Sequence, residues 1–503
     1  MALLAIRRTR HERLLNTNEP PDDSDSEFVC SVILEADVRL ACLDDEISKL
    51  QDKLTQLQDE RASLSKYLTR NKAILSPLRR MPPELLGEIF SWTLPSMKEI
   101  WARKHYLADS PWVLSHTSGS WRMVSLSIPS LWSRVAIDYS LEEEEYSLPL
   151  VEAQIRRAQN LKVHFYASRE SDSHRQRQMF EVLSKHSLQW EELSIGITSD
   201  MVPLLAALCG QLSSLKRLWI QWDDGEAENL EGAVQSINCF QTAASLVEFG
   251  FCNQSNFGPV SLPTHQLTRI QLDGPWEDHR GVLKLAPNLI EARLRFENYD
   301  EPQAELIDLL HLRRLRLSNP KALDNLRAPA LEELSFWVPP NQPPDVQAIQ
   351  AFTDRSACPL RRLSLGGFPD AQTTIQMLQK FAFIIELVII IDDPDAEQEI
   401  DLLISSLTIS QDTVVAPHLH SLFFGCEEDS RIDYKMYLEM LKSRFGARSA
   451  LRNAALLAER RRIDRETLRG LDALRGDGMD LLVVEGGAVS AEAKRWSYAT
   501  LWI

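Results

Sequence analysis

The side chains best suited to bind another molecule are arginines and tryptophans that fall at repeated spacings. They are Trp219, Arg293, Arg295, Arg316 and Trp337. A guanidinium group forms paired hydrogen bonds with a carboxylate or phosphate, and an indole offers a large apolar surface. An acidic or phosphorylated client protein would suit this set. The alternative is that the arginines pair with acids of the chain's own loops, such as Glu297, Asp300 or Glu301.

Motifs of catalysis are absent from the sequence. It has no Gly-rich phosphate loop, no Gly-x-Ser-x-Gly and no His-Glu-x-x-His. The "HLH" of 418–420 could offer a pair of metal ligands, but surface histidines are the more common outcome. "DDPDAE" (392–397) lacks the ordered ligand spacing of a calcium loop. We therefore expect no enzyme activity, no cofactor and no metal.

A recurring Leu-x-x-Leu-x-apolar pattern must position the arginines and tryptophans. Ten units start at Trp190, Leu215, Leu246, Leu267, Leu289, Leu312, Leu331, Leu360, Ile384 and Leu419. Their spacing, mostly in the 20s, is typical of leucine-rich repeats with loop insertions. Apolar residues three and five positions after each start predict a strand with one buried face. Stacked units would build one continuous core, so we expect a repeat solenoid over 138–503.

Charges on the other face of these strands alternate in sign at the second position after each start. The row reads Glu192, Arg217, Glu248, Arg269, Glu291, Arg314, Glu333, Arg362 and Glu386. Neighbouring strands lie about 4.8 Å apart, so the row predicts a ladder that neutralises itself and fixes strand order. Two positions later, Arg293 and Arg316 would be adjacent without an acid in their own row. This makes them, with the nearby Arg295, Trp219 and Trp337, the expected client surface.

A heptad repeat occupies 31–75, which contains no Gly or Pro. Its a positions are Ile33, Leu40, Ile47, Leu54, Arg61, Leu68 and Leu75, and its d positions Ala36, Leu43, Leu50, Leu57, Leu64 and Asn71. Such a seam predicts a coiled-coil helix that needs a partner. The partner is either a second copy, in a parallel homodimer through 33–75, or another part of the same chain. Residues 1–30 are expected to be a disordered leader.

Residues 76–137 carry a second pattern: "MPPELLGEIF" (81–90), then Trp121-Arg122 and "PSLW" (129–132). This pattern resembles an F-box, in particular that of mushroom-type fungal proteins, in which a coiled helix precedes the F-box and leucine-rich repeats follow it. The resemblance implies three short helices that bind the Skp-type adaptor and, through it, a cullin–RING ubiquitin ligase. It places Met81, Pro82, Leu85 and Ile89 at or beneath the adaptor surface, with Trp121 supporting the helices. Met81 stands where Leu is usual, and "HTSGSWR" (116–122) replaces the usual Val-Cys-Arg-x-Trp-Arg.

Composition limits the possible binding partners and the cellular location. The net charge of −17 argues against a nucleic-acid surface over most of the protein. The longest apolar run, "FAFIIELVIII" (381–391), is interrupted by Glu386 and is too short to span a membrane. Seven scattered cysteines without a Cys-x-x-Cys motif favour a reducing compartment, cytoplasmic or nuclear.

The predicted architecture is an α/β fold: an N-terminal coiled-coil helix, a small three-helix F-box, then a leucine-rich-repeat solenoid with a curved parallel sheet. The predicted function is that of a substrate-recognition adaptor of a cullin–RING (SCF-type) ubiquitin ligase. The alternative is a protein-interaction scaffold, outside any ligase, with leucine-rich repeats and a degenerate F-box.

Overall fold

The structure, a computed structural model, describes most of the chain. The described residues are 10–94, 111–139, 146–168, 173–198, 201–222, 237–252, 260–296, 305–338, 346–367, 370–391, 397–409, 414–426, 432–446, 451–458 and 463–496. The chain divides into two compact units, 1–86 and 87–503. Of the "DDPDAE" stretch only Glu397 is described.

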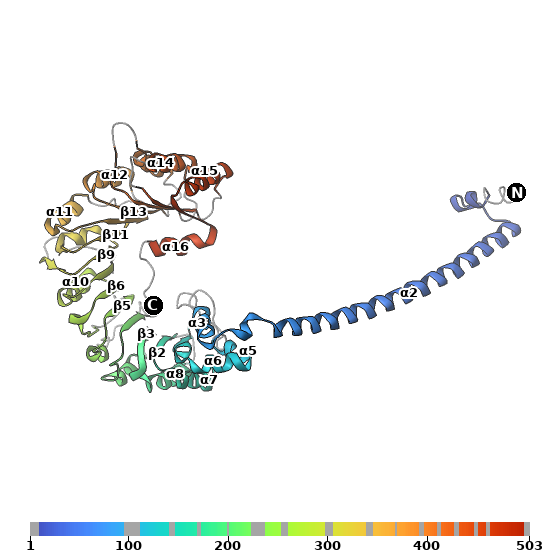
Figure 1. The fold of residues 1–503 in the computed structure, drawn as a ribbon, viewed down its shortest axis with the longest axis horizontal. Helices are drawn as coiled ribbons and strands as arrows, with labels where there is room; N and C mark the ends of the chain where they lie inside the picture. The colour runs from blue at the N-terminus through green and yellow to red at the C-terminus, as the bar shows by residue number, and fades with distance from the viewer. Residues whose placement is uncertain are drawn as a thin grey trace. The chain divides into compact units, whose positions relative to one another are not determined.

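The N-terminal unit is dominated by one helix, α2 (Asp23–Ile74), which is 52 residues long (Figure 1). It begins eight residues before the heptad pattern does, inside the predicted leader. Asp22 is the reason: its side chain accepts from the backbone N–H of Asp25, whose own side chain accepts from the backbone of Asp22. No residue of α2 is buried. A short 3₁₀ turn, η1 (Pro77–Arg80), follows.

Three short helices occupy the described part of the F-box-like segment, as predicted. They are α3 (Pro83–Thr93), α5 (Trp112–Thr117) and α6 (Gly119–Ser127), and the 3₁₀ turn η2 (Pro129–Trp132) closes the segment. Pro83 lies in the first turn of α3, where a missing N–H costs nothing. Ser118 caps α6 by accepting from the N–H of Trp121.

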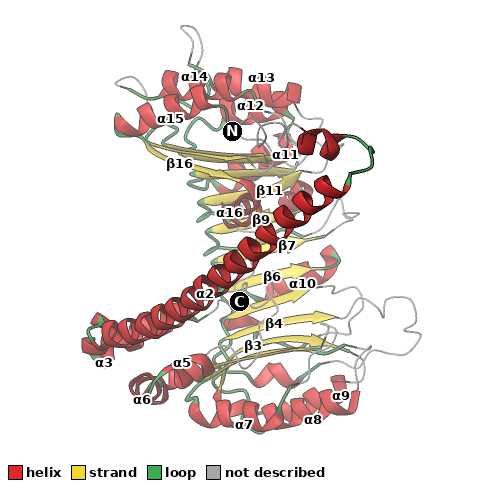
Figure 2. Ribbon diagram, turned by 90° about the vertical axis from the view of Figure 1, so that its right-hand side faces the viewer, coloured by secondary structure: helices red, strands yellow, loops and turns green. Residues whose placement is uncertain are grey.

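A parallel sheet of 14 strands runs through the described part of the second unit. The strands are β1 (Arg134–Asp138), β2 (Leu161–Tyr166), β3 (Trp190–Ile197), β4 (Arg217–Trp222), β5 (Glu248–Cys252), β6 (Arg269–Asp273), β7 (Glu291–Arg295), β9 (Arg314–Leu317), β11 (Glu333–Val338), β12 (Arg362–Gly367), β13 (Glu386–Ile391), β14 (Ser421–Cys426), β15 (Asn453–Ala458) and β16 (Asp480–Glu485). They follow one another in chain order, as in a solenoid (Figure 2). A small second sheet pairs β8 (Ile307–Asp308) with β10 (Leu326–Arg327).

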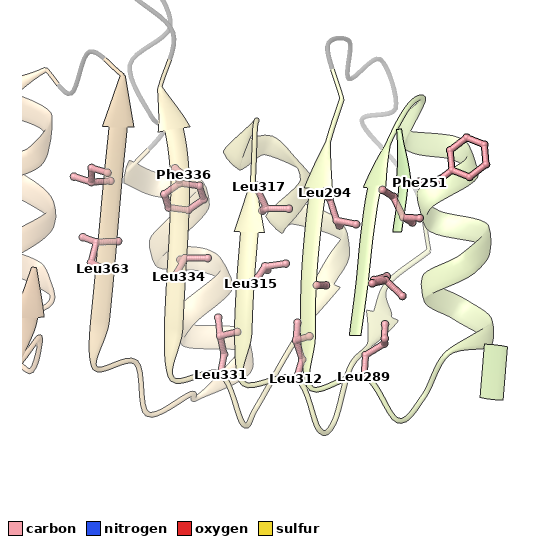
Figure 3. Packing of buried hydrophobic residues seen from close by; sticks show 14 of the residues in the cluster. Phe251, Leu289, Leu294, Leu312, Leu315, Leu317, Leu331, Leu334, Phe336 and Leu363 are labelled. Carbon is pink, nitrogen blue, oxygen red and sulfur yellow. The ribbon is translucent and has the colours of Figure 1, made fainter. Parts of the chain in front are cut away.

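The leucine pattern sets the register of the sheet, as the sequence predicted. Leu315 on β9 pairs with Leu334 on β11, which pairs with Leu363 on β12. These side chains are buried and point to one side, where they form a continuous core (Figure 3). Four strands lie outside the ten predicted units: β1 and β2 precede the first unit, and β15 and β16 follow the last.

Helices cover the side of the sheet to which the leucines point, so that the strands line the inner side of the arc (Figure 1). They are α7 (Leu148–Arg157), α8 (Ser173–Ser184), α9 (Val202–Leu205), α10 (Trp276–Leu285), α11 (Val346–Ser356), α12 (Ala371–Lys380), α13 (Glu397–Leu407), α14 (Tyr434–Arg444) and α15 (Arg465–Gly476). The 3₁₀ turns η3 (Ser187–Gln189) and η5 (Ala206–Leu208) follow α8 and α9. Between β4 and β5, between β5 and β6, and between β9 and β11, the described residues contain a 3₁₀ turn and no α-helix: η7 (Cys239–Thr242), η9 (Thr264–Gln266) and η10 (Pro320–Asn325). The chain then continues through η11 (Gly486–Ala488) into α16 (Val489–Trp496), which lies inside the arc.

Candidate functional site

One face of α3 presents apolar side chains to solvent. Leu85 is 57% exposed and Trp92 is 78% exposed, and the half-buried Ile89 lies between them on the same face. Leu86 and Phe90 occupy the opposite face and are buried. Residues at i, i+4 and i+7 share a face of a helix, so α3 has one stripe for the core and one for solvent. A solvent-facing apolar stripe is unfavourable unless another protein covers it.

The other residues implied by the F-box resemblance lie around this helix. Pro82 is exposed, and Met81 is half-buried at the end of η1. Trp121 on α6 is half-buried, and its ring centroid lies 4.9 Å from that of Phe90. Aromatic pairs at this spacing add specific packing energy to the burial of their surface. Trp121 is therefore placed to hold α6 against α3.

Trp132, the last residue of the F-box-like pattern, joins these helices to the repeats. It is fully buried, and its indole N–H donates to the carbonyl oxygen of Ser125 at 2.8 Å. The guanidinium of Arg157 on α7 lies 4.3 Å from the centre of the Trp132 ring and 4.4 Å from that of Trp112. Such cation–π contacts favour a fixed geometry. Helices α5 and α6 are thus anchored to the first helix of the solenoid.

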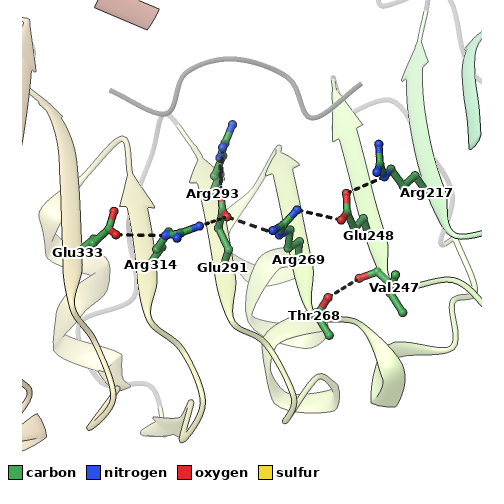
Figure 4. Close-up of polar contacts among 9 residues, drawn as sticks. All are labelled: Arg217, Val247, Glu248, Thr268, Arg269, Glu291, Arg293, Arg314 and Glu333. Carbon is green, nitrogen blue, oxygen red and sulfur yellow. Dashed lines mark hydrogen bonds and ion pairs between the residues drawn. The ribbon is translucent and has the colours of Figure 1, made fainter. Parts of the chain in front are cut away.

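The inner face of the sheet carries the predicted ladder of charges (Figure 4). Arg217 contacts Glu192 at 3.0 Å and Glu248 at 3.4 Å, and Arg269 contacts Glu248 at 2.9 Å. The row continues through Glu291, Arg314 and Glu333, and Arg362 contacts Glu386 at 2.5 Å. It also begins one strand earlier than predicted, because Lys162 on β2 contacts Glu192 at 2.6 Å. The prediction of a self-neutralising ladder is confirmed.

Arg293 does not stand free on this face, because it forms an ion pair with Glu291. It donates from Nε and Nη2 to Oε1 of Glu291, at 3.0 and 2.8 Å, and the residue is only 8% exposed. This partner is the ladder acid two residues before Arg293 in the sequence. The loop acids named above lie outside the described residues. The row of Arg293 contains no acid, as predicted, but the prediction overlooked that a side chain can reach along its own strand as well as across strands.

Arg316 lies beside Arg293 on the neighbouring strand, as the repeat alignment predicted. It is half-buried, and this burial, with the nearby Arg293 as a second cause, lowers the pKa of Arg316 to about 10. It therefore remains charged at neutral pH. The space among these side chains is about 10 Å³, enough for roughly one water molecule.

The tryptophans of the inner face pack on glycines of the next strand. Trp219 is only 3% exposed, and its six-membered ring lies where a side chain on Gly250 would project. The expectation that Trp219 is exposed was therefore wrong. Trp337 lies over Gly366 in the same way but is half-buried. Arg295 is open to solvent, with Nη1 at 3.6 Å from Asp273 and 75% of its side chain exposed.

Sequence reasoning missed that α16 covers the inner face near β13–β15. Val489, Ala493 and Trp496 are buried against residues of these strands, including Val388. Arg362 of the ladder also donates to the carbonyl oxygen of Trp496 at 2.7 Å. The sequence did indicate that this part of the inner face is covered, because the row that holds Arg293 ends in the apolar residues Val388 and Phe423. An apolar stretch on an otherwise polar face indicates that something covers it.

Other kinds of site were searched among the described residues. They contain no group of three or more His, Cys, Asp or Glu side chains placed to hold a metal ion. His418 and His420 are exposed and precede β14 instead of lying on it. No helix among the described residues combines the length and the apolar character needed to cross a membrane.

Comparisons with known proteins do not establish a family for this chain. No known family's sequence profile matches the chain, and no curated protein matches it significantly. A solved structure described as "Crystal structure of TLR13-ssRNA13 complex" matches 55% of this chain, with 14% identity and a TM-score of 0.31. The match spans only 43% of that chain, and so low a TM-score supports no argument about this protein. The solenoid architecture rests instead on the strand register described above.

Proposed function

We propose that this protein is a non-enzymatic adaptor whose F-box-like helices bind a Skp-type adaptor, and through it a cullin–RING ubiquitin ligase. The observation that carries the proposal is the solvent-facing stripe of Leu85, Ile89 and Trp92 on α3. The stripe includes two of the residues that the F-box resemblance places at the adaptor surface. The opposite face of the same helix is buried, so the stripe is not needed for the helix's own packing.

The repeats would present the client protein. Of the five predicted client residues, Arg295, Arg316 and Trp337 keep exposed surface, and they lie on three adjacent strands of the sheet. Two cations beside an indole suit an acidic or phosphorylated segment. Arg293 and Trp219 would act indirectly in this arrangement, by holding the strands in place.

The test is binding of the purified protein to a purified Skp-type adaptor, with Leu85→Asp as the decisive variant. Leu85 is more than half exposed, so the fold should tolerate the change, whereas a charge placed in an apolar contact costs several kcal/mol. We expect binding to weaken by about a hundredfold or more. Leu188→Asp is the matched control, because Leu188 is similarly exposed but lies in the repeats.

Two results would count against the proposal. If Leu85→Asp binds as well as Leu188→Asp, the stripe on α3 is not the adaptor surface. If the wild-type protein does not bind the adaptor at all, the ligase function is excluded, and an interaction scaffold with a degenerate F-box becomes the better description.

A further inference from the structure

Helix α2 exposes an apolar seam along most of its length. Leu50, for example, is 68% exposed, and the other leucines and isoleucines of the heptad between 33 and 75 are also exposed. A seam with a period of 3.5 residues is typical of helices that pair side by side. The charges beside the seam indicate which partner and which direction fit.

Four charged side chains flank the seam at successive g positions of the heptad, and their signs alternate. They are Arg39, Glu46, Lys53 and Glu60. Along the described α2 helix none of them has an ion-pair partner, whereas Lys49 on another face pairs with Asp45 at 2.5 Å. The e positions on the other side of the seam are Asp37, Asp44, Gln51, Gln58, Ser65 and Lys72.

In a parallel, in-register pair of helices, most of these charged side chains would not meet a side chain of opposite charge. In that arrangement each g residue meets the e residue of the partner's next heptad. Arg39 would meet the partner's Asp44, but Glu46 and Lys53 would meet uncharged glutamines. Arg61, at an a position, would lie against its own copy in the seam. Like charges in direct contact destabilise a pair.

We propose that α2 forms an antiparallel homodimer, in which seam residues whose numbers add up to 97 lie opposite each other. Ile47 then faces the partner's Leu50, and the overlap extends over 33–64 of each helix. Arg61 lies opposite the partner's Ala36, a small residue that leaves room for the arginine to reach water. Asn71 falls outside the overlap.

The flanking charges are complementary in this register. In an antiparallel pair g residues meet g residues, so Glu46 meets the partner's Lys53, and Arg39 meets the partner's Glu60. The twofold axis repeats both contacts. A slide by one heptad in either direction brings either Lys53 or Glu46 against its own copy. The alternating charges therefore select one antiparallel register.

This dimer would carry two copies of each interaction surface. A client with two binding segments, or a client that is itself a dimer, would be held more tightly than by one chain. The inference does not depend on the F-box, because a scaffold outside any ligase would gain in the same way.

The test exchanges charges in the full-length protein, using Glu46→Lys and Lys53→Glu. Either change alone turns both copies of one contact from attractive to repulsive, and we expect the homodimer dissociation constant to rise by about tenfold. Mixing the two variants restores attraction at both contacts. The mixture should therefore form a heterodimer about as tight as the wild-type dimer, as measured by sedimentation of chains carrying two different fluorophores.

Controls carry the same charge changes on the outer face of the helix: Asp52→Lys and Lys49→Glu. Both should leave dissociation within about twofold of wild type, because these positions do not border the seam. Wild-type protein that is monomeric at micromolar concentration would overturn the proposal. So would single variants that dimerise normally, or a mixture no tighter than its components, since Glu46 and Lys53 do not meet in a parallel dimer.

Discussion

Replacing Glu291 with Gln should destabilise the repeat sheet more than any other single loss of charge in the ladder. The Glu291 carboxylate is buried and contacts guanidinium groups from three strands. It accepts from Arg293 at 2.8 and 3.0 Å, lies 3.4 Å from Arg314 and lies 3.7 Å from Arg269. Glutamine has the same shape but no charge, so it isolates the electrostatic part of these contacts.

The magnitude follows from how deeply each partner is buried. The Arg293 side chain is only 9% exposed, and removing the partner of a buried charge costs about 3–5 kcal/mol. Arg269 and Arg314 are 42% and 43% exposed, so each loses only about 0–1 kcal/mol. The glutamine oxygen still accepts one hydrogen bond, which recovers part of the loss. We expect a net destabilisation of about 3 kcal/mol.

Urea unfolding, together with hydrogen exchange of β7 and β9, measures this effect. The matched control is Glu332→Gln, because Glu332 is 43% exposed and lies 4.0 Å from Arg313, so its loss should cost less than about 1 kcal/mol. Adding Arg293→Met to Glu291→Gln should restore part of the stability, since it removes the buried guanidinium that has lost the Glu291 carboxylate. If Glu291→Gln proves as stable as Glu332→Gln, the buried pair contributes nothing and the reasoning fails.

Two further predictions concern packing and pH. Gly250→Ala should lower the free energy of unfolding by about 1–3 kcal/mol, because the new methyl group overlaps the buried Trp219 ring. The control is Gly281→Ala in α10, which should be neutral or slightly stabilising because there is open space around Gly281. Thermal unfolding measures both, and equal effects of the two variants would contradict the packing of Trp219 on Gly250. Burial lowers the pKa of His279 to about 4 and that of His164 to about 3. Below about pH 6.5 the unfolded chain binds protons at these histidines while the folded chain does not. The free energy of unfolding should therefore decrease as the pH is lowered from about 6.5 to 4, by about 1.4 kcal/mol per pH unit for each histidine. His279→Leu should reduce this slope in urea unfolding measured across that range, and an unchanged slope would show that His279 is accessible to protons in the folded state.

The sequence determined those features that depend on periodicity along the chain. The spacing of the leucines fixed which residues face the core, because side chains alternate strictly along a strand. The same alternation fixed which charges share the other face, so the ladder from Glu192 onward was predictable before any strand was placed. The helices of the F-box-like segment followed from the spacing of apolar residues and from Pro83.

The tertiary structure alone decided which side chains within a row touch and how deeply each is buried. Arg293 bonds to Glu291 on its own strand because the carboxylate lies within reach and no solvent competes there. Trp219 lies flat because the next strand offers the bare backbone of Gly250, and α16 covers Val388 although about a hundred residues separate them in the sequence. Such contacts depend on distances across strands and between distant segments. Periodicity carries no information about them, because it records only which face a residue occupies.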